Sequence, residues 1–553
     1  MRFMDSLSAL RRIPLRPLVW GFFAVTLALG LWVAKDYGIS WDEKAMFVLG
    51  EESYEYVVLG EEYPTHIGIR YHGSFLEIFL YAAEELFHLR YARHVFIFRH
   101  AVTFLLYWGG MIAVYALALR QFKHRGWALL AALIYFLSPR QFGHAFVNSR
   151  DIPAMVFFTV KMLTLLYFLD HKTIRSAVLH GMICGMVVAL RIGGLFAPIF
   201  TVIFFLVEIL REHLKGERIL WKRYALLLTL YAGVFIFSTI AFWPLLWDKP
   251  FVNFYEAVHN MMTSQQSPGG LYFGTSIGQT PWHWIFVHFI TKTPPLYVGL
   301  FFAGVTAFMI DAFRHPRALL FERRDLLLFF SWFAIPISIV IVLEADLFDE
   351  WRHLYFIYPA VVLIAVHGLR ELMRMTKCVN RLRLRQAFLA TLIAVPAAGF
   401  VSVAVWMVRF HPLEYVYFSL PSKYVEFNFE LDYWGLSYRQ GFEWILENDP
   451  DEFVTVTVTS SPGWENLNIL TREQRRRLVL SKKYTSKYVL DNFDWQEYRH
   501  TLPEDTIVHS VKVSGMPVLN VYRNPFWTYE KIDPEDIMEN EKVQMWFDPK
   551  SML

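Results

Sequence analysis

The sequence predicts a polytopic α-helical membrane protein, and three observations carry this prediction. Of the 553 residues, 55% are hydrophobic and 19% are charged, whereas soluble domains average about 25% charged residues. About eleven apolar runs are long enough to cross a hydrocarbon core of about 30 Å. The loops between these runs alternate between basic composition and mixed or acidic composition. An ordinary soluble enzyme is thereby excluded.

The expected transmembrane segments lie near 17–34, 94–119, 127–144, 153–169, 177–190, 192–210, 224–246, 295–313, 326–344, 353–372 and 387–408. The fifth and sixth are separated only by Arg191-Ile192-Gly193-Gly194, which fits either a tight turn or a broken helix. The N-terminus is basic, and no small-residue cleavage site follows the first apolar run. We therefore expect that run to be kept as a helix, not removed as a signal peptide.

Lysine and arginine are concentrated in the loops of one membrane face. One such loop holds Arg120, Lys123 and Arg125, and the others span 211–223, 314–324 and 374–385. Because short basic loops stay in the cytoplasm, we expect these loops and the N-terminus to be cytoplasmic. The loops 35–93, 247–294 and 345–352 and the tail 409–553 then face outward.

Two domains are expected. Residues 1–408 would form the transmembrane module, and 409–553 a small α/β extracytoplasmic domain with strands at 453–459, 507–513 and 517–522 and helices at 438–447 and 472–477. The loop 35–93 is amphipathic, which predicts helices lying in the membrane interface. The loop 247–294 contains Gly269, Gly270 and Gly274, which is typical of a mobile lid.

Two adjacent acids, Asp42 and Glu43, follow the first span directly. A carboxylate held near apolar surface can accept a proton from a hydroxyl group. An equally compatible alternative is that Ser40 or Asp42 caps a polar helix that begins near Glu43. The first interpretation makes them catalytic candidates.

Charged residues also lie at the outward ends of two later spans. Arg150 and Asp151 stand before the fourth span, where a charged pair is costly unless it is paired or lines a cavity. The alternative is a turn capped by Asp151, with Pro153 at the first helical position. Arg352 and His353 open the tenth span, where the arginine could bind a phosphate or extend to lipid headgroups.

Several other outward residues are weaker candidates for a polar cleft. Arg70 and His72 lie in the first outer loop, His259 and Lys292 in the lid-like loop, and Arg191 beside two glycines.

Three segments resemble a known family: Phe146-Val147-Asn148-Ser149-Arg150-Asp151-Ile152-Pro153, Trp351-Arg352-His353-Leu354-Tyr355-Phe356-Ile357-Tyr358-Pro359 and Glu430-Leu431-Asp432-Tyr433-Trp434-Gly435-Leu436-Ser437. Together with the acid pair after the first helix, they are similar to the C-type (GT-C) glycosyltransferases. They look more particularly like the bacterial glycosyltransferase-39-like group, which is related to protein O-mannosyltransferases and lipid A aminoarabinose transferases. The resemblance covers about residues 18–450.

The resemblance implies transfer of a sugar from a polyprenyl-phosphate donor to a lipid, glycan or protein acceptor at the outer face of the bacterial cytoplasmic (inner) membrane. Asp42 would be the catalytic base, with Glu43 as its neighbour and Asp151 positioning the acceptor or a metal. Arg352, His353, Lys292 and Arg191 would bind the donor phosphate, and Arg150, His72, Arg70 and His259 the substrates. Asp42 and Asp151 could hold Mg²⁺ or Mn²⁺. A single displacement would invert the anomeric configuration.

Two other classes of function compete with this one. A transporter or lipid flippase would place its ionisable residues mid-span and show internal repeats, whereas the charges here gather at helix ends. A receptor or assembly scaffold would use 409–553 to bind a partner, which leaves the outward acids unexplained. Membrane lipids are expected partners, and nucleic acid is not.

Overall fold

The computed structural model describes residues 15–64, 67–263, 270–347, 349–481, 486–493 and 502–527. Within these residues nine helices are long and apolar enough to cross a membrane, and two shorter apolar helices complete the eleven predicted segments. The protein is therefore a polytopic α-helical membrane protein, as predicted. Residues 1–14, most of the basic N-terminal arm, lie outside the described residues.

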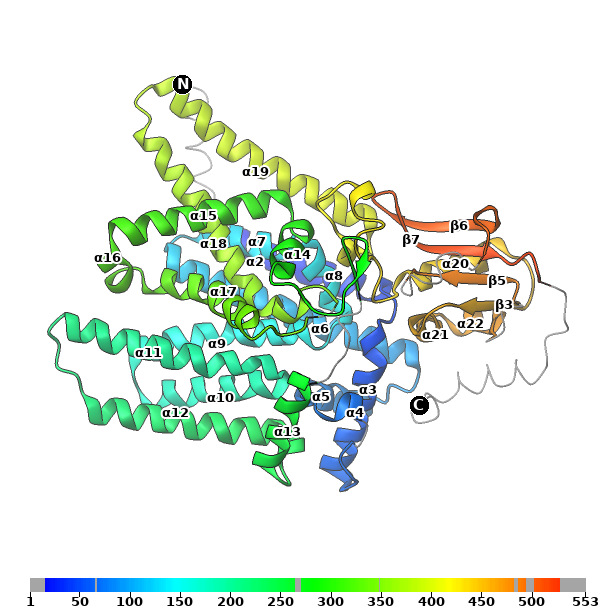
Figure 1. The fold of residues 1–553 in the computed structure, drawn as a ribbon, viewed down its shortest axis with the longest axis horizontal. Coiled ribbons are helices and arrows are strands. Elements are labelled where there is room, and N and C mark those ends of the chain that lie inside the picture. Colours follow the sequence, from blue (N-terminus) through cyan, green and yellow to red (C-terminus); the bar gives the residue numbers. More distant parts are fainter. Residues whose placement is uncertain are drawn as a thin grey trace.

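The apolar helices run side by side in one bundle (Figure 1). They are α2 (Leu15–Val33), α6 (Ala92–Phe122), α7 (Arg125–Phe136), α9 (Asp151–His171), α10 (Ile174–Leu190), α11 (Phe196–Leu214), α12 (Trp221–Phe242), α15 (Pro295–Arg314), α17 (Arg324–Val342), α18 (Tyr358–Met375) and α19 (Leu382–Phe410).

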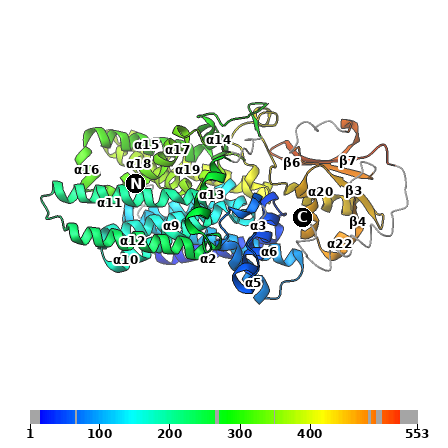
Figure 2. The same ribbon diagram turned by 60° about the horizontal axis from the view of Figure 1, so that its bottom comes forward.

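The two ends of the bundle differ in what they carry. At one end, here called the sheet end, lie α3 (Trp41–Tyr54), α5 (Phe75–Leu86) and the C-terminal β-sheet (Figures 1 and 2). At the other, here called the basic end, residues from all four predicted basic loops line one cavity. The alternation of loop composition therefore corresponds to the two ends of one bundle.

One predicted span is broken. The apolar pattern predicts one segment over 127–144, but α7 ends at Phe136, and a separate short helix, α8 (Pro139–Val147), follows. Proline lacks a backbone N–H and is favoured in the first turn of a helix, so Pro139 begins α8. The hydroxyl of Ser138 donates to the carbonyl of Ile134 at 2.6 Å and closes the junction.

The open question at Arg191–Gly194 is settled as a turn. The 3₁₀ segment η3 (Ile192–Leu195) joins α10 to α11. A Cβ at Gly194 would lie 2.5 Å from the carbonyl oxygen of Val187, so only glycine allows this close return of the chain. The turn brings Arg191 to the sheet end, where it contacts Asp151.

Short helices occupy the sheet end around the bundle. The segment after α2 contains α3, the π-helical turn η2 (Glu55–Leu59), α4 (Ile67–Arg70) and α5. The predicted lid-like loop contains η4 (Pro244–Leu246), α13 (Pro250–Thr263), the hairpin β1 (Leu271–Tyr272) and β2 (Thr275–Ser276), and α14 (Trp284–Lys292). Residues 264–269 of this loop lie outside the described residues. Two further short segments, α16 (Pro316–Phe321) at the basic end and η5 (Arg352–Ile357) at the sheet end, precede α17 and α18.

The C-terminal region forms a five-stranded sheet in the order β4-β3-β5-β7-β6. Its strands are β3 (Val454–Val458), β4 (Leu478–Leu480), β5 (Tyr488–Asp491), β6 (Ile507–Val513) and β7 (Met516–Arg523), and its helices α20 (Ser437–Asn448), α21 (Ser461–Asn466) and α22 (Arg472–Arg477). β3 runs parallel to β4 and β5, whereas β7 runs antiparallel to β5 and β6. The three predicted strands and both predicted helices are present, and β4 and β5 were missed.

A close contact between glycines fixes α15 against α18. A Cβ at Gly304 would lie 2.2 Å from the carbonyl oxygen of Ile364, and one at Gly368 would lie 2.2 Å from that of Leu300. Small residues allow helix backbones to approach in this way inside a membrane.

Gly304→Ala should therefore push α15 away from α18. We expect it to lower the free energy of unfolding by about 1–3 kcal/mol, the usual cost of overpacking. Thermal unfolding in one detergent would measure this, with Gly299→Ala as the matched control because a Cβ at Gly299 meets nothing within 4 Å. Equal melting temperatures for the two variants would contradict the contact.

Candidate active site

The two acids after the first span enter different surroundings. Glu43 is buried, accepts a hydrogen bond from the backbone N–H of Ser40 at 2.6 Å, and lies 2.8 Å from Nε2 of His100. It completes a capping box at the start of α3. Asp42, one residue earlier, keeps 21% of its side chain exposed. Of the two predicted cap residues, Ser40 is therefore the N-cap of α3, and the partly exposed carboxylate is that of Asp42.

Asp151 is buried at the first position of α9. The side-chain carbonyl of Asn148 accepts the backbone N–H groups of Arg150 and Asp151 at 3.2 and 2.8 Å, and its amide donates to Asp151 at 2.9 Å. The helix start is thereby capped, and the carboxylate is fixed in place. His144 in turn lies 3.0 Å from the Asn148 amide.

Arg352 joins these acids. Its Nη1 lies 3.3 Å from a carboxylate oxygen of Asp42 and 3.3 Å from one of Asp151, and its Nη2 donates to Asp349 at 2.6 Å. The guanidinium also lies over the ring of Trp434, 5.0 Å from the ring centroid. Three separate segments of the chain therefore meet at one buried arginine.

Two further arginines complete this cluster. Arg191 forms an ion pair with Asp151, and Nη1 of Arg150 lies 3.6 Å from Asp42. The group thus contains three guanidinium groups (Arg150, Arg191, Arg352) and three carboxylates (Asp42, Asp151, Asp349), and we call it the acid–arginine cluster. Its charges balance, as a buried set of ions requires. Burial raises the pKa of Asp349, although Arg352 opposes the rise.

The other substrate candidates fall into two groups. His72 lies 3.1 Å from Nη2 of Arg150, and His353 lines a small cavity with Asp151, Arg191 and Arg352. Arg70, by contrast, donates to the carbonyl of Pro64 at 3.1 Å, and His259 is exposed on α13, with its ring stacked on Tyr255. The structure therefore brings His72 and His353 to the cluster and places Arg70 and His259 in other contacts.

Lys292 belongs to a second ion cluster next to the first. It is buried and forms an ion pair with Glu350, which also pairs with Arg140. Burial lowers the pKa of Lys292 to about 7, although Glu350 opposes the shift. The sequence analysis expected Lys292 at the donor phosphate, but its partner here is a protein carboxylate.

A strained turn separates the two clusters. Asp349 and Glu350 are consecutive, and both have left-handed backbones, with φ of 47° and 71°. Left-handed non-glycine residues cost about 1–3 kcal/mol each and persist where the surroundings hold them. Here Asp349 is held by Arg352, and Glu350 by Arg140 and Lys292, so one turn directs two neighbouring carboxylates to different cations.

The C-terminal region holds the segment that carries Asp42. The side chain of Asn466 accepts the backbone N–H of Ile39 at 3.0 Å and donates to its carbonyl at 2.8 Å, and the N–H of Trp41 donates to the carbonyl of Trp434 at 3.3 Å. A Cβ at Gly38 would lie 2.2 Å from the Asn466 oxygen. Asp42 is thus positioned from the sheet domain as well as from the bundle.

Sequence reasoning did not assign a role to several residues that build the site: His144, Asn148, Asp349, Tyr433 and Trp434. The hydroxyl groups of Tyr433 and Tyr355 lie 2.9 and 3.3 Å from Nε2 of His144, on the side away from Asn148. The available signal was the position of Asn148, Tyr433 and Trp434 inside the three segments that carry the family resemblance.

The residues present do not fit a resident divalent cation. Asp42 and Asp151, the proposed Mg²⁺ or Mn²⁺ ligands, are both engaged by Arg352, and the cluster around them is already neutral. The part of the chain that the structure describes contains no group of three or more His, Cys, Asp or Glu residues placed to hold a metal. A dication would have to displace arginines, so no step is assigned to a metal.

Comparisons with known proteins find similarity only in structure. No family model matches the chain, and no curated protein matches it. ArnT from Cupriavidus metallidurans, bound to undecaprenyl phosphate, is similar over 93% of this chain and 99% of its own, with 15% identity and a TM-score of 0.48. The archaeal oligosaccharyltransferase AglB from Archaeoglobus fulgidus, in complex with an inhibitory peptide and a dolichol-phosphate, covers 86% of this chain and 70% of its own, with 14% identity and a TM-score of 0.45.

Both proteins are C-type glycosyltransferases, the group that the sequence resembles. At 15% and 14% identity the likeness concerns the fold alone.

The ion cluster of Lys292, Glu350 and Arg140 allows a test of these buried ion pairs. Glu350→Gln would leave Arg140 and Lys292 buried without their shared carboxylate. We expect a loss of about 3–5 kcal/mol in the free energy of unfolding, as when one partner of a buried ion pair is removed. Thermal unfolding in detergent would measure this. Glu344→Gln, in the same connection but exposed, should change stability little, and equal stability of both variants would contradict the buried pairing.

Proposed function

We propose that the protein is a membrane glycosyltransferase of the C type that moves a sugar from a polyprenyl-phosphate donor to an acceptor hydroxyl. The observation that carries the proposal is the convergence of Asp42, Asp151 and Arg352, which come from three distant segments. A partly exposed acid beside the buried Arg352 supplies both requirements of the reaction, a base for the acceptor and positive charge for the phosphate that leaves.

In the proposed reaction the carboxylate of Asp42 accepts the proton of the acceptor hydroxyl. The acceptor oxygen then bonds to the anomeric carbon as the bond from that carbon to the phosphate oxygen breaks. Arg352, with Arg150 and Arg191, stabilises the polyprenyl phosphate as it leaves. One displacement inverts the anomeric configuration, and Asp151 acts as a positioning residue that orients Arg191 and Arg352.

The proposal includes an arrangement in the membrane. Basic loops stay in the cytoplasm, so the sheet end would face outward, and the membrane would be the bacterial cytoplasmic membrane. Residues 1–408 would form the catalytic module and 409–553 the extracytoplasmic domain. The acceptor, whether lipid, glycan or protein, would approach Asp42 from the exposed side of α3.

Transport of a lipid is the alternative. It would favour a charged site near the middle of the membrane. Asp151 is the first residue of α9, and Arg352 the first of η5, so the acid–arginine cluster lies at helix ends. This position favours chemistry at the membrane interface.

Asp42→Asn removes the proposed base with almost no change in shape. We expect transfer to fall roughly 10²- to 10⁴-fold, the usual contribution of a general base. The measurement is release and transfer of label from a panel of radiolabelled polyprenyl-phosphate sugars, with membrane-extract acceptors, and Asp248→Asn is the matched control because Asp248 is exposed. Transfer that survives in Asp42→Asn would remove Asp42 from its role, and wild-type protein that transfers from no donor would refute the class.

Asn466→Ala removes the hydrogen bonds that hold Ile39. Because displacing a catalytic group by about 1 Å can cost on the order of 10²-fold, we expect kcat to fall by about tenfold or more, with the donor KM nearly unchanged. Asn448→Ala, an exposed asparagine of the same region, is the control. A loss confined to KM or to stability would show that Asn466 does not position Asp42.

A further inference from the structure

A large cavity lies at the basic end of the bundle, far from the acid–arginine cluster. Its volume is about 470 Å³, and its walls come from the ends of α6, α9, α11 and α18 and from the start of α17. The same helix, α9, runs from Asp151 in the cluster to Asp170 in this cavity, a rise of roughly 29 Å at 1.5 Å per residue. The cavity therefore opens at the opposite membrane interface.

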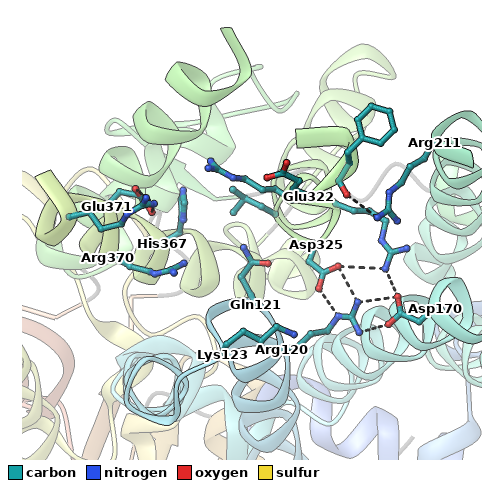
Figure 3. A pocket seen from close by; sticks show the side chains of 15 residues that line it. Arg120, Gln121, Lys123, Asp170, Arg211, Glu322, Asp325, His367, Arg370 and Glu371 are labelled. Carbon is teal, nitrogen blue, oxygen red and sulfur yellow. Dashed lines mark hydrogen bonds and ion pairs between the residues drawn. The ribbon is translucent and has the colours of Figure 1, made fainter. Parts of the chain in front are cut away.

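The walls are rich in cations. Seven lysine and arginine side chains line the cavity, against four acids. Ion pairs hold part of this charge: Arg120 lies 2.5 Å from Asp170 and 2.5 Å from Asp325 (Figure 3). Arg374 pairs with Glu371 at 3.0 Å within the lining, and from outside it Glu208 reaches Arg211 and Arg324, and Asp311 reaches Arg323.

Two cations stay outside these pairs. In the described part of the chain, Lys123 and Arg370 form no ion pair with a carboxylate, and Arg370 lies over the ring of Phe122, 5.6 Å from its centroid. Glu322 is the lining acid that likewise forms no ion pair within the described residues. The cavity therefore keeps two uncompensated cations against one uncompensated acid.

The walls also present buried donors without partners. His367 is 3% exposed, and neither ring nitrogen has a hydrogen-bond partner among the described residues; the same holds for the Nε atoms of Arg211 and Arg324. In Figure 3, His367 and Arg370 lie on one side of the cavity and Arg120, Asp170 and Arg211 on the other, with Gln121 between them. Buried polar groups are nearly always hydrogen-bonded, so these atoms indicate a missing acceptor.

We propose that this cavity binds the phosphate of an anionic lipid headgroup, at the membrane interface opposite the acid–arginine cluster. Phosphate oxygens are acceptors only, and they match a site built from guanidinium, ammonium and imidazole donors. Basic cavities between transmembrane helices are known to bind phosphate headgroups in this way. Lys123, Arg370 and His367 are the residues that would contact the phosphate.

The surroundings favour a lipid over a soluble phosphate. Large apolar side chains are exposed at the basic end of the bundle: Leu214 on α11 is 56% exposed, Met375 on α18 is 59% exposed, and Phe313 on the neighbouring α15 is 80% exposed. The acyl chains of a lipid whose phosphate enters the cavity would lie along such residues, whereas a soluble phosphate has no apolar part to contact them.

The test measures binding in place of sugar transfer, so its result is independent of the proposed reaction. The full-length protein in mild detergent is incubated with cardiolipin, which carries two phosphates, or with phosphatidylcholine, and bound lipid is counted by native mass spectrometry. We expect wild-type protein to bind cardiolipin preferentially. The double variant Lys123→Gln/Arg370→Gln should weaken that binding by about tenfold or more, since it removes two charge-assisted contacts.

Controls separate this site from general attraction to a basic surface. Arg218→Gln/Arg383→Gln removes two exposed cations of the predicted basic loops outside the cavity and should leave cardiolipin binding unchanged. His367→Leu should weaken binding without removing a lysine or arginine, and melting temperatures would confirm that each variant is folded. Equal loss in the control and cavity variants, or no loss in the cavity variants, would overturn the proposal.

A second arm identifies the source of the phosphate. Pyrophosphate is titrated into wild-type protein held in phosphatidylcholine nanodiscs. We expect pyrophosphate to bind weakly or not at all, and we expect Lys123→Gln/Arg370→Gln to weaken the binding of cardiolipin. Pyrophosphate binding that is lost in Lys123→Gln/Arg370→Gln, with cardiolipin binding unaffected, would assign the cavity to a soluble phosphate and overturn the lipid assignment.

Discussion

A single buried guanidinium, that of Arg352, connects the parts of the sheet end. It contacts Asp42 after the first span, Asp151 at the start of α9 and Asp349 in its own turn, and it lies against Trp434 of the C-terminal region. A charge buried this deeply is tolerated only when partners surround it. The positions of four segments are therefore linked, because moving any of them would leave charge unpaired.

The sheet domain takes part in this arrangement. Asn466 holds the backbone of Ile39, and Arg439 donates to the carbonyl oxygens of Lys35 and Tyr37 at 2.7 and 2.9 Å. These bonds fix the segment between α2 and α3, which would otherwise be an exposed connection. On the bundle side, Ser149 donates to Glu77 at 2.6 Å, and Arg99 pairs with both Glu77 and Glu84. Burial raises the pKa of Glu77, and it raises that of Glu84 to about 7. The contacts on the bundle side therefore also include buried carboxyl groups.

The two ends of the bundle use charge differently. At the sheet end the six members of the acid–arginine cluster balance one another, with Asp42 left partly exposed. At the basic end, within the described residues, Lys123, Arg370 and Glu322 form no ion pair, and the cavity contains buried polar atoms without hydrogen-bond partners. Since α9 and the segment η5–α18 reach both ends, the same helices carry a site suited to a reacting acid and a site suited to an anion.

Much of the fold could be read from the sequence. Apolar runs of membrane length and loops of alternating charge predicted the helical bundle, because a hydrocarbon core demands length and hydrophobicity wherever a chain crosses it; of the eleven predicted segments, nine helices in the described residues have membrane length and two are shorter. Alternation in β3, β6 and β7 predicted those strands. It did not predict β4 and β5, three and four residues long, because so few residues give no periodicity to read.

The sequence by itself determined which residues were available for chemistry: Asp42, Asp151 and Arg352 stood out because charges beside apolar spans are costly. Only the tertiary structure decided their partners. In the structure Glu43 lies beside His100, and Lys292 forms an ion pair with Glu350. Asn148, Asp349 and Trp434 contact members of the acid–arginine cluster. The reason is physical: hydrophobicity and helix length act locally along the chain, whereas the pairing of buried charges depends on which helix ends meet in space.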